Sequence, residues 1–195
     1  ADDLNGLSLQ AWVTTAYLIV STVVTPIAGK LSDIYGRRPV YLASIGFFLL
    51  GSVMSGFAWS MQSLAFFRAV QGIGAGGLMS LAFTIIADIV APRERGRYQG
   101  YFIAVFGSSS VLGPLIGGFF ADAPEILWVD GWRWVFLINI PIGAFAIFMV
   151  LRFLHIPQNL HKVKIDWWGV STVILAVVPL LLVAEQGREW GWLSP

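Results

Sequence analysis

The chain contains no cysteine and little charge. The lack of cysteine excludes a disulfide framework and a thiolate metal site. Charged residues make up 12% of the 195 residues and the formal net charge is +1, which argues against nucleic acid as a partner. The opening Ala-Asp-Asp has neither a methionine nor a basic stretch, so no signal peptide is visible and we expect a chain cropped from a longer one.

Apolar side chains are abundant instead, at 57% of the residues. They gather in six runs, each about as long as the roughly 20 residues that a helix needs to cross a bilayer. We expect all six to be helices, because lipid offers the backbone of an unclosed chain no other hydrogen-bond partners. The predicted fold class is therefore all-α, a polytopic membrane helical bundle. The expected spans are 11–29, 39–57, 65–88, 98–121, 135–154 and 167–185.

Basic residues concentrate in every second connection between these spans. The three basic connections carry Lys30, Arg37 and Arg38; Arg93, Arg95 and Arg97; and Arg152, Lys162 and Lys164. Because basic loops stay in the cytoplasm, we expect both chain ends on the outer side of the cell membrane. An outer belt of interfacial aromatic residues is also expected, made of Trp59, Trp128, Trp132, Trp134, Trp190 and Trp192.

The first motif is the polar sequence GKLSDIYGRR at 29–38, which we expect to form a short cytoplasmic loop. It resembles the loop between helices 2 and 3 of the major facilitator superfamily, roughly G-x-L-x-D-[RK]-x-G-R-[RK], except that Ile34 stands where a second basic residue is usual. The resemblance implies a cytoplasmic gate that latches two helix bundles together. Its residues would be Asp33, Gly36, Arg37 and Arg38, with Asp88 as the partner of one arginine. The alternative is a set of loop charges that only fixes topology.

The second motif places Arg68 inside the third span, where a charge is costly and by default marks function. Gln71 lies three residues further on, along the same helix face. The pair resembles the motif R-x-x-Q-G-x-G of helix 4 in the same superfamily, which implies a role in coupling protons to substrate. Tyr17 in the first span is a candidate for the same path. The alternatives are that Arg68 reaches up to the outer interface and that Tyr17 only packs.

Two sets of glycines predict close packing between helices. Gly72 and Gly76 lie four residues apart in the third span. The fourth span contains Gly113, Pro114, Gly117 and Gly118, and its proline removes one helix hydrogen bond. This second set resembles the antiporter motif G-x-x-x-G-P-x-x-G-G of helix 5, which implies export by exchange. A generic kinked helix is the alternative.

Two further segments extend the resemblance to nearly the whole chain. The sequences WRWVFLINIPIG at 132–143 and DWWG at 166–169 are similar to the entries of helices 6 and 7 in 14-helix drug:proton antiporters. The resemblance implies that the chain covers helices 2 to 7 of such a protein, with helix 1 and the C-terminal bundle elsewhere. The predicted organisation is a transporter bundle over 1–154, a cytoplasmic loop over 155–165 and a linker helix over 166–195.

The predicted function is a proton-coupled secondary active transporter that exports amphiphilic drugs or toxic compounds by alternating access. Its partners would be a small amphiphilic substrate, protons, membrane lipid and the rest of the transporter chain. We expect no enzyme activity, no metal site and no cofactor, because no catalytic set fits this layout and the proton gradient would drive transport. One alternative is an exporter of a lipid, a siderophore or an endogenous antibiotic. Others are a pore, which would need a ring of polar side chains, or a non-transporting membrane subunit.

Overall fold

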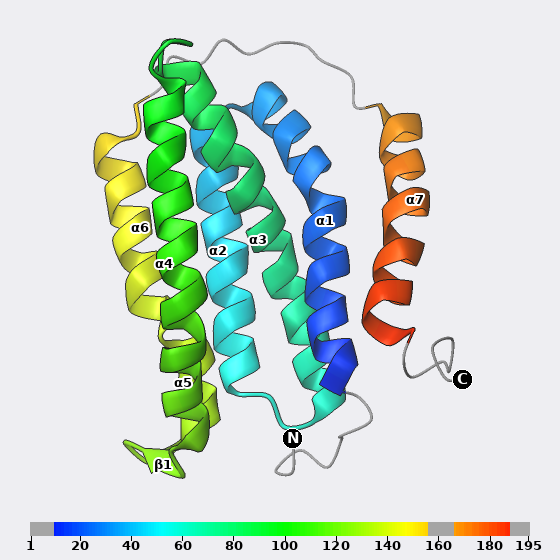
Figure 1. The fold of residues 1–195 in the computed structure, drawn as a ribbon, viewed down its shortest axis with the longest axis vertical. Helices are drawn as coiled ribbons and strands as arrows, with labels where there is room; N and C mark the ends of the chain where they lie inside the picture. The colour runs from blue at the N-terminus through cyan, green and yellow to red at the C-terminus, as the bar shows by residue number, and fades with distance from the viewer. Residues whose placement is uncertain (1–9, 156–165, 188–195) are drawn as a thin grey trace.

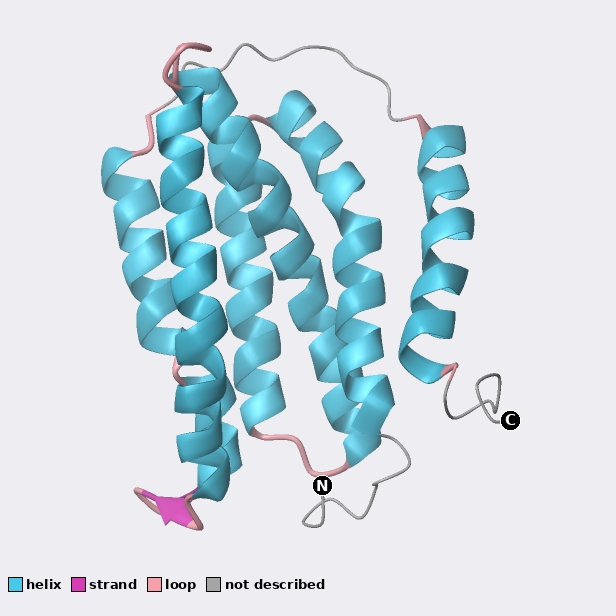
Figure 2. Cartoon of the chain, in the orientation of Figure 1, coloured by secondary structure: helices cyan, strands magenta, loops and turns pink. Residues whose placement is uncertain are grey.

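The computed structural model describes residues 10–155 and 166–187 (Figure 1). Its helices are α1 (Gln10–Tyr35), α2 (Arg37–Gly56), α3 (Met61–Ile89), α4 (Arg95–Asp122), α5 (Gly131–Leu137), α6 (Asn139–Phe153) and α7 (Trp167–Gln186). Two short strands, β1 (Glu125–Ile126) and β2 (Val129–Asp130), lie between α4 and α5 (Figure 2). Within these residues, six segments are long and apolar enough to cross a membrane, with α5 and α6 counted as one. The all-α membrane bundle predicted from the sequence is confirmed.

Helix α3 is the central element, with α1 and α2 packed along it. Helix α6 lies against α2, α5 contacts both α2 and α4, and α7 stands beside α1. The turns that contain Gly36 and Arg93 lie at the same end of the bundle, the upper end in Figure 1, as does the end of α6. We call this the basic end. The alternation of up and down helices inferred from the charge pattern is therefore present in the structure.

The glycines of α3 set its distance from both neighbours. A Cβ atom at Gly72 would lie 2.7 Å from the backbone oxygen of Tyr17 in α1, and one at Gly76 would collide with the backbone oxygen of Ser21. Gly74 faces the other way, against the backbone of α2. Small residues let membrane helices approach this closely because no hydrophobic force pulls helices together within lipid. The packing predicted for Gly72 and Gly76 is confirmed.

The connection between α1 and α2 is shorter than the sequence suggested. The loop expected over 29–38 is wrong, because α1 continues through Tyr35 and α2 begins at Arg37. Only Gly36 separates them, with φ 94° and ψ 153°. Because a side chain at this positive φ would be strained, glycine allows the chain to reverse in a single residue. As a result, Asp33 and Arg37 lie on helix ends of fixed geometry.

The fifth span predicted over 135–154 is confirmed as one membrane-length segment, Gly131–Phe153. It consists of α5 and α6, and Ile138 between them keeps helical dihedrals and its hydrogen bond to the carbonyl oxygen of Trp134. Pro141 then falls in the first turn of α6, where its missing N–H group has no helical partner to lose. The strands before α5 form a tight hairpin whose turn residues Leu127 and Trp128 both have positive φ. This hairpin was not predicted from the sequence.

Helix α4 contains no buried residue in the described part of the chain. A Cβ atom added at Gly113, Gly117 or Gly118 would meet nothing within 4 Å. The close packing predicted for this glycine set is therefore absent among the described residues, although Pro114 does lie inside the helix as expected. The glycine face of α4 is open, and any helix that it contacts must come from outside these residues.

Candidate functional site

An ion-pair cluster joins three helices at the basic end. Arg37, at the start of α2, has its Nη1 atom 2.6 Å from Asp33 Oδ1 on α1 and its Nε atom 2.7 Å from Asp88 Oδ2 on α3. Arg37 also donates to Ser32 Oγ. The two carboxylate side chains are 29% and 37% exposed, so the pairs are only partly desolvated and each is modest in strength. The contact that the sequence suggested for Asp88 is thus made by Arg37, while the gating role of the cluster stays a prediction.

Two other arginines at this end bind backbone carbonyls instead of carboxylates. Arg38 donates to the carbonyl oxygen of Leu151 at 2.7 Å, and this bond ties the start of α2 to the last turn of α6. Its Nε atom is buried without a hydrogen-bond partner among the described residues. Arg95 donates to the carbonyl oxygens of Ala87 and Val90 and so caps the end of α3. Of the two arginines offered as the partner of Asp88, Arg38 is thus the one that does not pair with it.

A second polar cluster lies inside the bundle, closer to the opposite end. Arg68 Nη1 donates to Gln71 Oε1 at 2.6 Å, and the guanidinium Cζ lies 4.0 Å from the centre of the Tyr17 ring. Phe136 of α5 lies on the cation as well, at 5.9 Å. The structure thus brings together all three residues that the sequence analysis selected for this site. Among the described residues, Arg68 takes part in no salt bridge. Its positive charge is stabilised instead by the amide oxygen of Gln71 and by the faces of the Tyr17 and Phe136 rings.

Two further residues of this cluster were missed by the sequence analysis. Ser52 of α2 accepts hydrogen bonds from Gln71 Nε2 at 2.6 Å and from Asn139 Nδ2 at 3.2 Å. Ser52 is fully buried and Asn139 is half-buried at the start of α6. The run of small residues around Ser52, which includes Gly51, was the available signal, because it marks a close approach of helices.

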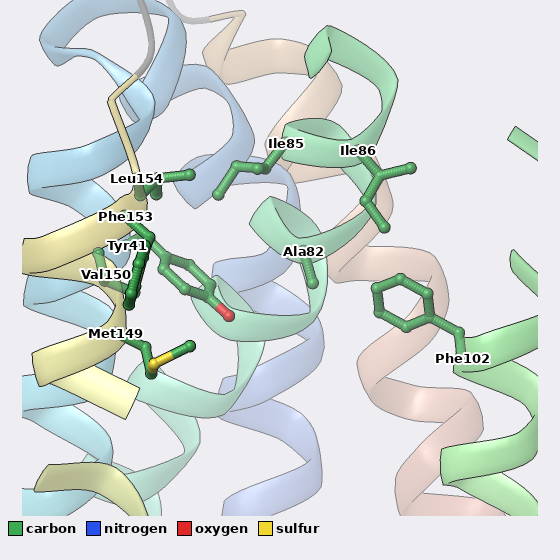
Figure 3. Close-up of a pocket in the computed structure, with 9 residues that line it drawn as sticks. All are labelled: Tyr41, Ala82, Ile85, Ile86, Phe102, Met149, Val150, Phe153 and Leu154. Carbon is green, nitrogen blue, oxygen red and sulfur yellow. The ribbon is translucent and has the colours of Figure 1, made fainter. Parts of the chain in front are cut away.

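An apolar groove runs along α3 on the side of α4 and α6. Figure 3 shows the pocket at its basic end, about 320 Å³ in volume, which is lined by Tyr41, Ala82, Ile85, Ile86, Phe102, Met149, Val150, Phe153 and Leu154. The hydroxyl group of Tyr41 points into this pocket (Figure 3). Two neighbouring pockets share Met79 as a lining residue; one of about 500 Å³ lies between α3 and α4, and one of about 310 Å³ includes Asn139. We call these three pockets the α3–α4 groove.

The described residues do not contain a cluster of three or more His, Cys, Asp or Glu side chains that could hold a metal ion. Two of the residues considered in the sequence analysis, Lys162 and Lys164, lie outside the described residues, as do Trp190 and Trp192. The polar chemistry of the described bundle is therefore concentrated in the cluster at its basic end and the cluster around Arg68. Both are made of charges and amides that can exchange partners when helices move.

Six membrane-length segments with a half-buried arginine inside the bundle and an ion-pair cluster at one end are typical of a polytopic membrane protein of the transporter class. The chain belongs to the Major Facilitator Superfamily, whose family model matches residues 1–193. Members of this family are transporters and not enzymes. The family expected from the motifs is confirmed, and the chain is accordingly a multi-pass protein of the cell membrane.

The similar proteins include two from Bacillus subtilis (strain 168). The chain is 44% identical over 193 residues to "Multidrug resistance protein 3", covering 98% of this chain and 36% of that protein. It is 41% identical over 191 residues to "Multidrug transporter protein MdtP", covering 97% of this chain and 34% of that protein. The chain therefore spans about a third of the length of these relatives.

A solved structure has the same fold. The inward open conformation of the xylose transporter XylE from E. coli matches with a TM-score of 0.65 and 18% sequence identity. The match covers 95% of this chain and 46% of that one. The described helices therefore correspond to about half of a major facilitator fold.

Proposed function

We propose that this chain is part of a proton-coupled exporter that moves amphiphilic drugs or other toxic compounds across the cell membrane by alternating access. The observation that carries the proposal is the Arg68 cluster, because a guanidinium at membrane depth is costly in free energy and by default marks a functional site. The names of the two Bacillus relatives support the cargo class.

The ion-pair cluster at the basic end supports the alternating-access part of the proposal. Arg37 holds three helices together through Asp33 and Asp88, and these pairs are exposed enough to break and re-form at low cost. A gate that must open in every transport cycle needs contacts of this moderate strength. Because a fully buried ion pair is costly to break, a gate made of such pairs would remain in its closed conformation.

The α3–α4 groove supports the expectation that further helices of the same transporter complete the site. Helix α4 buries none of its own residues here, and its large apolar side chains Ile103 and Phe106 line the groove and are exposed. We infer that the helix preceding α1 in the full-length protein fills this groove, and that cargo passes beside it. An engineered disulfide between Phe106→Cys and a cysteine in that preceding helix would test the placement, whereas cross-linking to α7 alone would contradict it.

The proposal is tested with the full-length transporter in proteoliposomes under an imposed pH gradient. We expect a fluorescent amphiphilic dye to move against its gradient, with counterflow of protons. Arg68→Ala should abolish this coupled movement, whereas Arg93→Ala, at an exposed position in the turn after α3, should preserve it. Dye flux without proton exchange would indicate a pore, and transport of phospholipid in place of dye would indicate a lipid exporter. A wild type that moves neither dye nor phospholipid would favour a non-transporting subunit, and unchanged coupled movement in Arg68→Ala would contradict the role of Arg68.

A further inference from the structure

Two buried polar side chains, Ser52 and Gln71, and two half-buried ones, Arg68 and Asn139, form one continuous chain of hydrogen bonds. Arg68 donates to Gln71, Gln71 donates to Ser52, and Asn139 donates to the same serine oxygen. These four residues come from α3, α2 and α6. We call this set the polar relay. It connects the first half of α3 to the last turns of α2 and to the start of α6.

The hydrogen bonds of the polar relay can run in only one direction, because Arg68 can only donate. A guanidinium has no acceptor, so Gln71 must present its amide oxygen to Arg68 and its amide nitrogen to Ser52. Gln71 is 2% exposed and Ser52 is 0% exposed, so the amide nitrogen has no bulk water as an alternative partner. A buried amide without a partner is costly. Ser52 therefore holds the amide of Gln71 in the orientation that binds Arg68.

Two glycines bring the helices of the relay within hydrogen-bond distance. A Cβ atom at Gly51, next to Ser52, would lie 2.6 Å from Gln71 Cβ, so the absence of a side chain allows α2 to meet α3 at this point. Gly143 lies one turn after Asn139 and packs against the end of the Leu49 side chain of α2, not against its backbone. These contacts fix the place where α3 and α6 meet Ser52.

The last member of the relay lies where α5 and α6 meet in the fifth span. Asn139 is the first residue of α6, directly after Ile138, and it also lines the α3–α4 groove. Ile138 keeps helical dihedrals and donates to the carbonyl oxygen of Trp134 at 3.0 Å, so α6 continues the direction of α5 closely. The hydrogen bond from Asn139 therefore links Ser52 to the fifth span at a fixed position.

We propose that Ser52 and Asn139 are positioning residues, which fix the amide of Gln71 and through it the place of the Arg68 guanidinium over Tyr17. The effect on transport rests on the proposed role of Arg68 in proton coupling. The positioning itself depends only on the contacts of the relay. The two parts can therefore be tested separately.

The first experiment measures how fast phenylglyoxal modifies Arg68 in the full-length transporter, by mass spectrometry of the peptide that contains it. Ser52→Ala removes the acceptor of Gln71 and should speed the modification by about threefold or more, since a hydrogen bond to a charged group is lost or weakened. Ser52→Thr keeps the hydroxyl group and should behave like the wild type.

Ser55 provides a matched control on the same helix. Its Oγ atom is also fully buried, but it has no hydrogen-bond partner among the described residues. Ser55→Ala thus removes the same atom from the same helix without touching the relay, and it should leave the modification rate unchanged. Equal rates for the two alanine variants would overturn the proposal.

A second variant covers the case in which Ser52→Ala does not fold. Asn139→Leu has a similar size and removes the donor at a half-buried position. It should speed the modification of Arg68 less than Ser52→Ala does, because its hydrogen bond is the longest of the relay at 3.2 Å. A rate equal to that of the wild type would contradict the assignment of Asn139 to the relay.

The second experiment measures the pH dependence of dye transport in the same variants. A shift in the midpoint of the pH profile for Ser52→Ala, restored in Ser52→Thr, is expected if Arg68 sets the proton affinity of the transport site. A purely structural defect would lower the rate at every pH without moving the midpoint, and would overturn this consequence. If the wild type shows no proton-dependent transport, the proposed function fails, while the modification rates still decide the positioning role.

Discussion

Gly51 of α2 lies directly against Gln71 of α3, with no room between them for a side chain. A Cβ atom at Gly51 would come within 2.6 Å of the Cβ of Gln71 and would also collide with the backbone of Gln71. Gly46 is five residues earlier on the same helix and has nothing within 4 Å of its own Cβ position. One helix thus contains a glycine that sets an interhelical distance and another that sets none.

The two glycines should respond in opposite ways to the same substitution. Gly51→Ala forces α2 and α3 apart and should lower the free energy of unfolding by about 1–3 kcal/mol. Gly46→Ala removes backbone freedom without a clash and should raise the free energy of unfolding by up to about 1 kcal/mol. Thermal unfolding of the full-length protein in detergent measures both. Equal midpoints for the two variants would show that the close approach at Gly51 is not real.

The ion-pair cluster should matter more for transport than for stability. Asp33→Asn removes one partner of Arg37 while Asp88 remains at 2.7 Å, so we expect normal expression and a stability change below about 1 kcal/mol. Transport should nevertheless be slower, because the closed gate loses one of the two pairs that hold it. Initial rates of dye efflux in vesicles measure this effect.

Asp122 is the control for the loss of an acidic residue. It lies exposed at the end of α4 that is far from Arg37, so Asp122→Asn makes the same chemical change outside the cluster. That variant should transport at the wild-type rate. Normal transport by Asp33→Asn would contradict the gate.

Arg133 should act as a structural clamp at the end opposite the ion-pair cluster. Its Nη1 atom donates to the carbonyl oxygens of Gly56 and Ala58 at 2.8 and 3.0 Å, so it binds α5 to the turn after α2. Its Nε atom is 2.8 Å from Asp130, a side chain that is 52% exposed. Arg133→Ala leaves both carbonyl oxygens without their hydrogen-bond donor and should lower the free energy of unfolding by about 1–3 kcal/mol. Asp130→Asn should lower the free energy of unfolding by less than about 1 kcal/mol.

The same thermal unfolding measurement compares these two variants. The comparison is informative because both substitutions break the Arg133–Asp130 pair, and only Arg133→Ala also removes the bonds to α2. A larger loss of stability for Asp130→Asn than for Arg133→Ala would show that the ion pair contributes most to the stability of this end, and that the hydrogen bonds to the carbonyl oxygens contribute little.

Several features of the fold could be predicted because they depend on where a residue lies along the chain. The pairing of Asp88 with an arginine near Gly36 follows from the number of membrane crossings between them, which places both at the same end. The clustering of Arg68 with Gln71 follows from helix periodicity. Such features need only the spacing of polar residues in an apolar sequence.

Features that depend on helix rotation could not be predicted in the same way. The spans are apolar on all sides, so the sequence does not indicate which face of α2 meets α3, and Ser52 received no role. The boundary between α5 and α6 at Ile138 lies in a uniformly apolar run and leaves no compositional mark except Pro141, which a continuous membrane helix also tolerates. The single-residue turn at Gly36 was hidden because a polar sequence is typical of both loops and helix ends.

The orientation of the whole bundle in the membrane can be tested with single cysteines, because these 195 residues contain none. Glu94 is exposed in the turn between α3 and α4, beside Arg93 and Arg95, and Trp128 is 91% exposed at the tip of the hairpin. Because basic connections stay in the cytoplasm, Glu94→Cys should react with a membrane-impermeant maleimide only after the cells are opened. Trp128→Cys should react on intact cells.

Trp128→Cys is the control for Glu94→Cys, since it should be labelled on intact cells, where Glu94→Cys is not, and both should be labelled after the cells are opened. The parent protein gives the background from cysteines elsewhere in the chain. Arg37 and Arg93 both lie at the basic end, so the result for Glu94→Cys also places the ion-pair cluster. Labelling of Glu94→Cys on intact cells would show that the bundle has the opposite orientation, with the Arg37 cluster on the outer side of the membrane. The gate would then close toward the opposite side, and the direction of export proposed for this chain would have to be reversed.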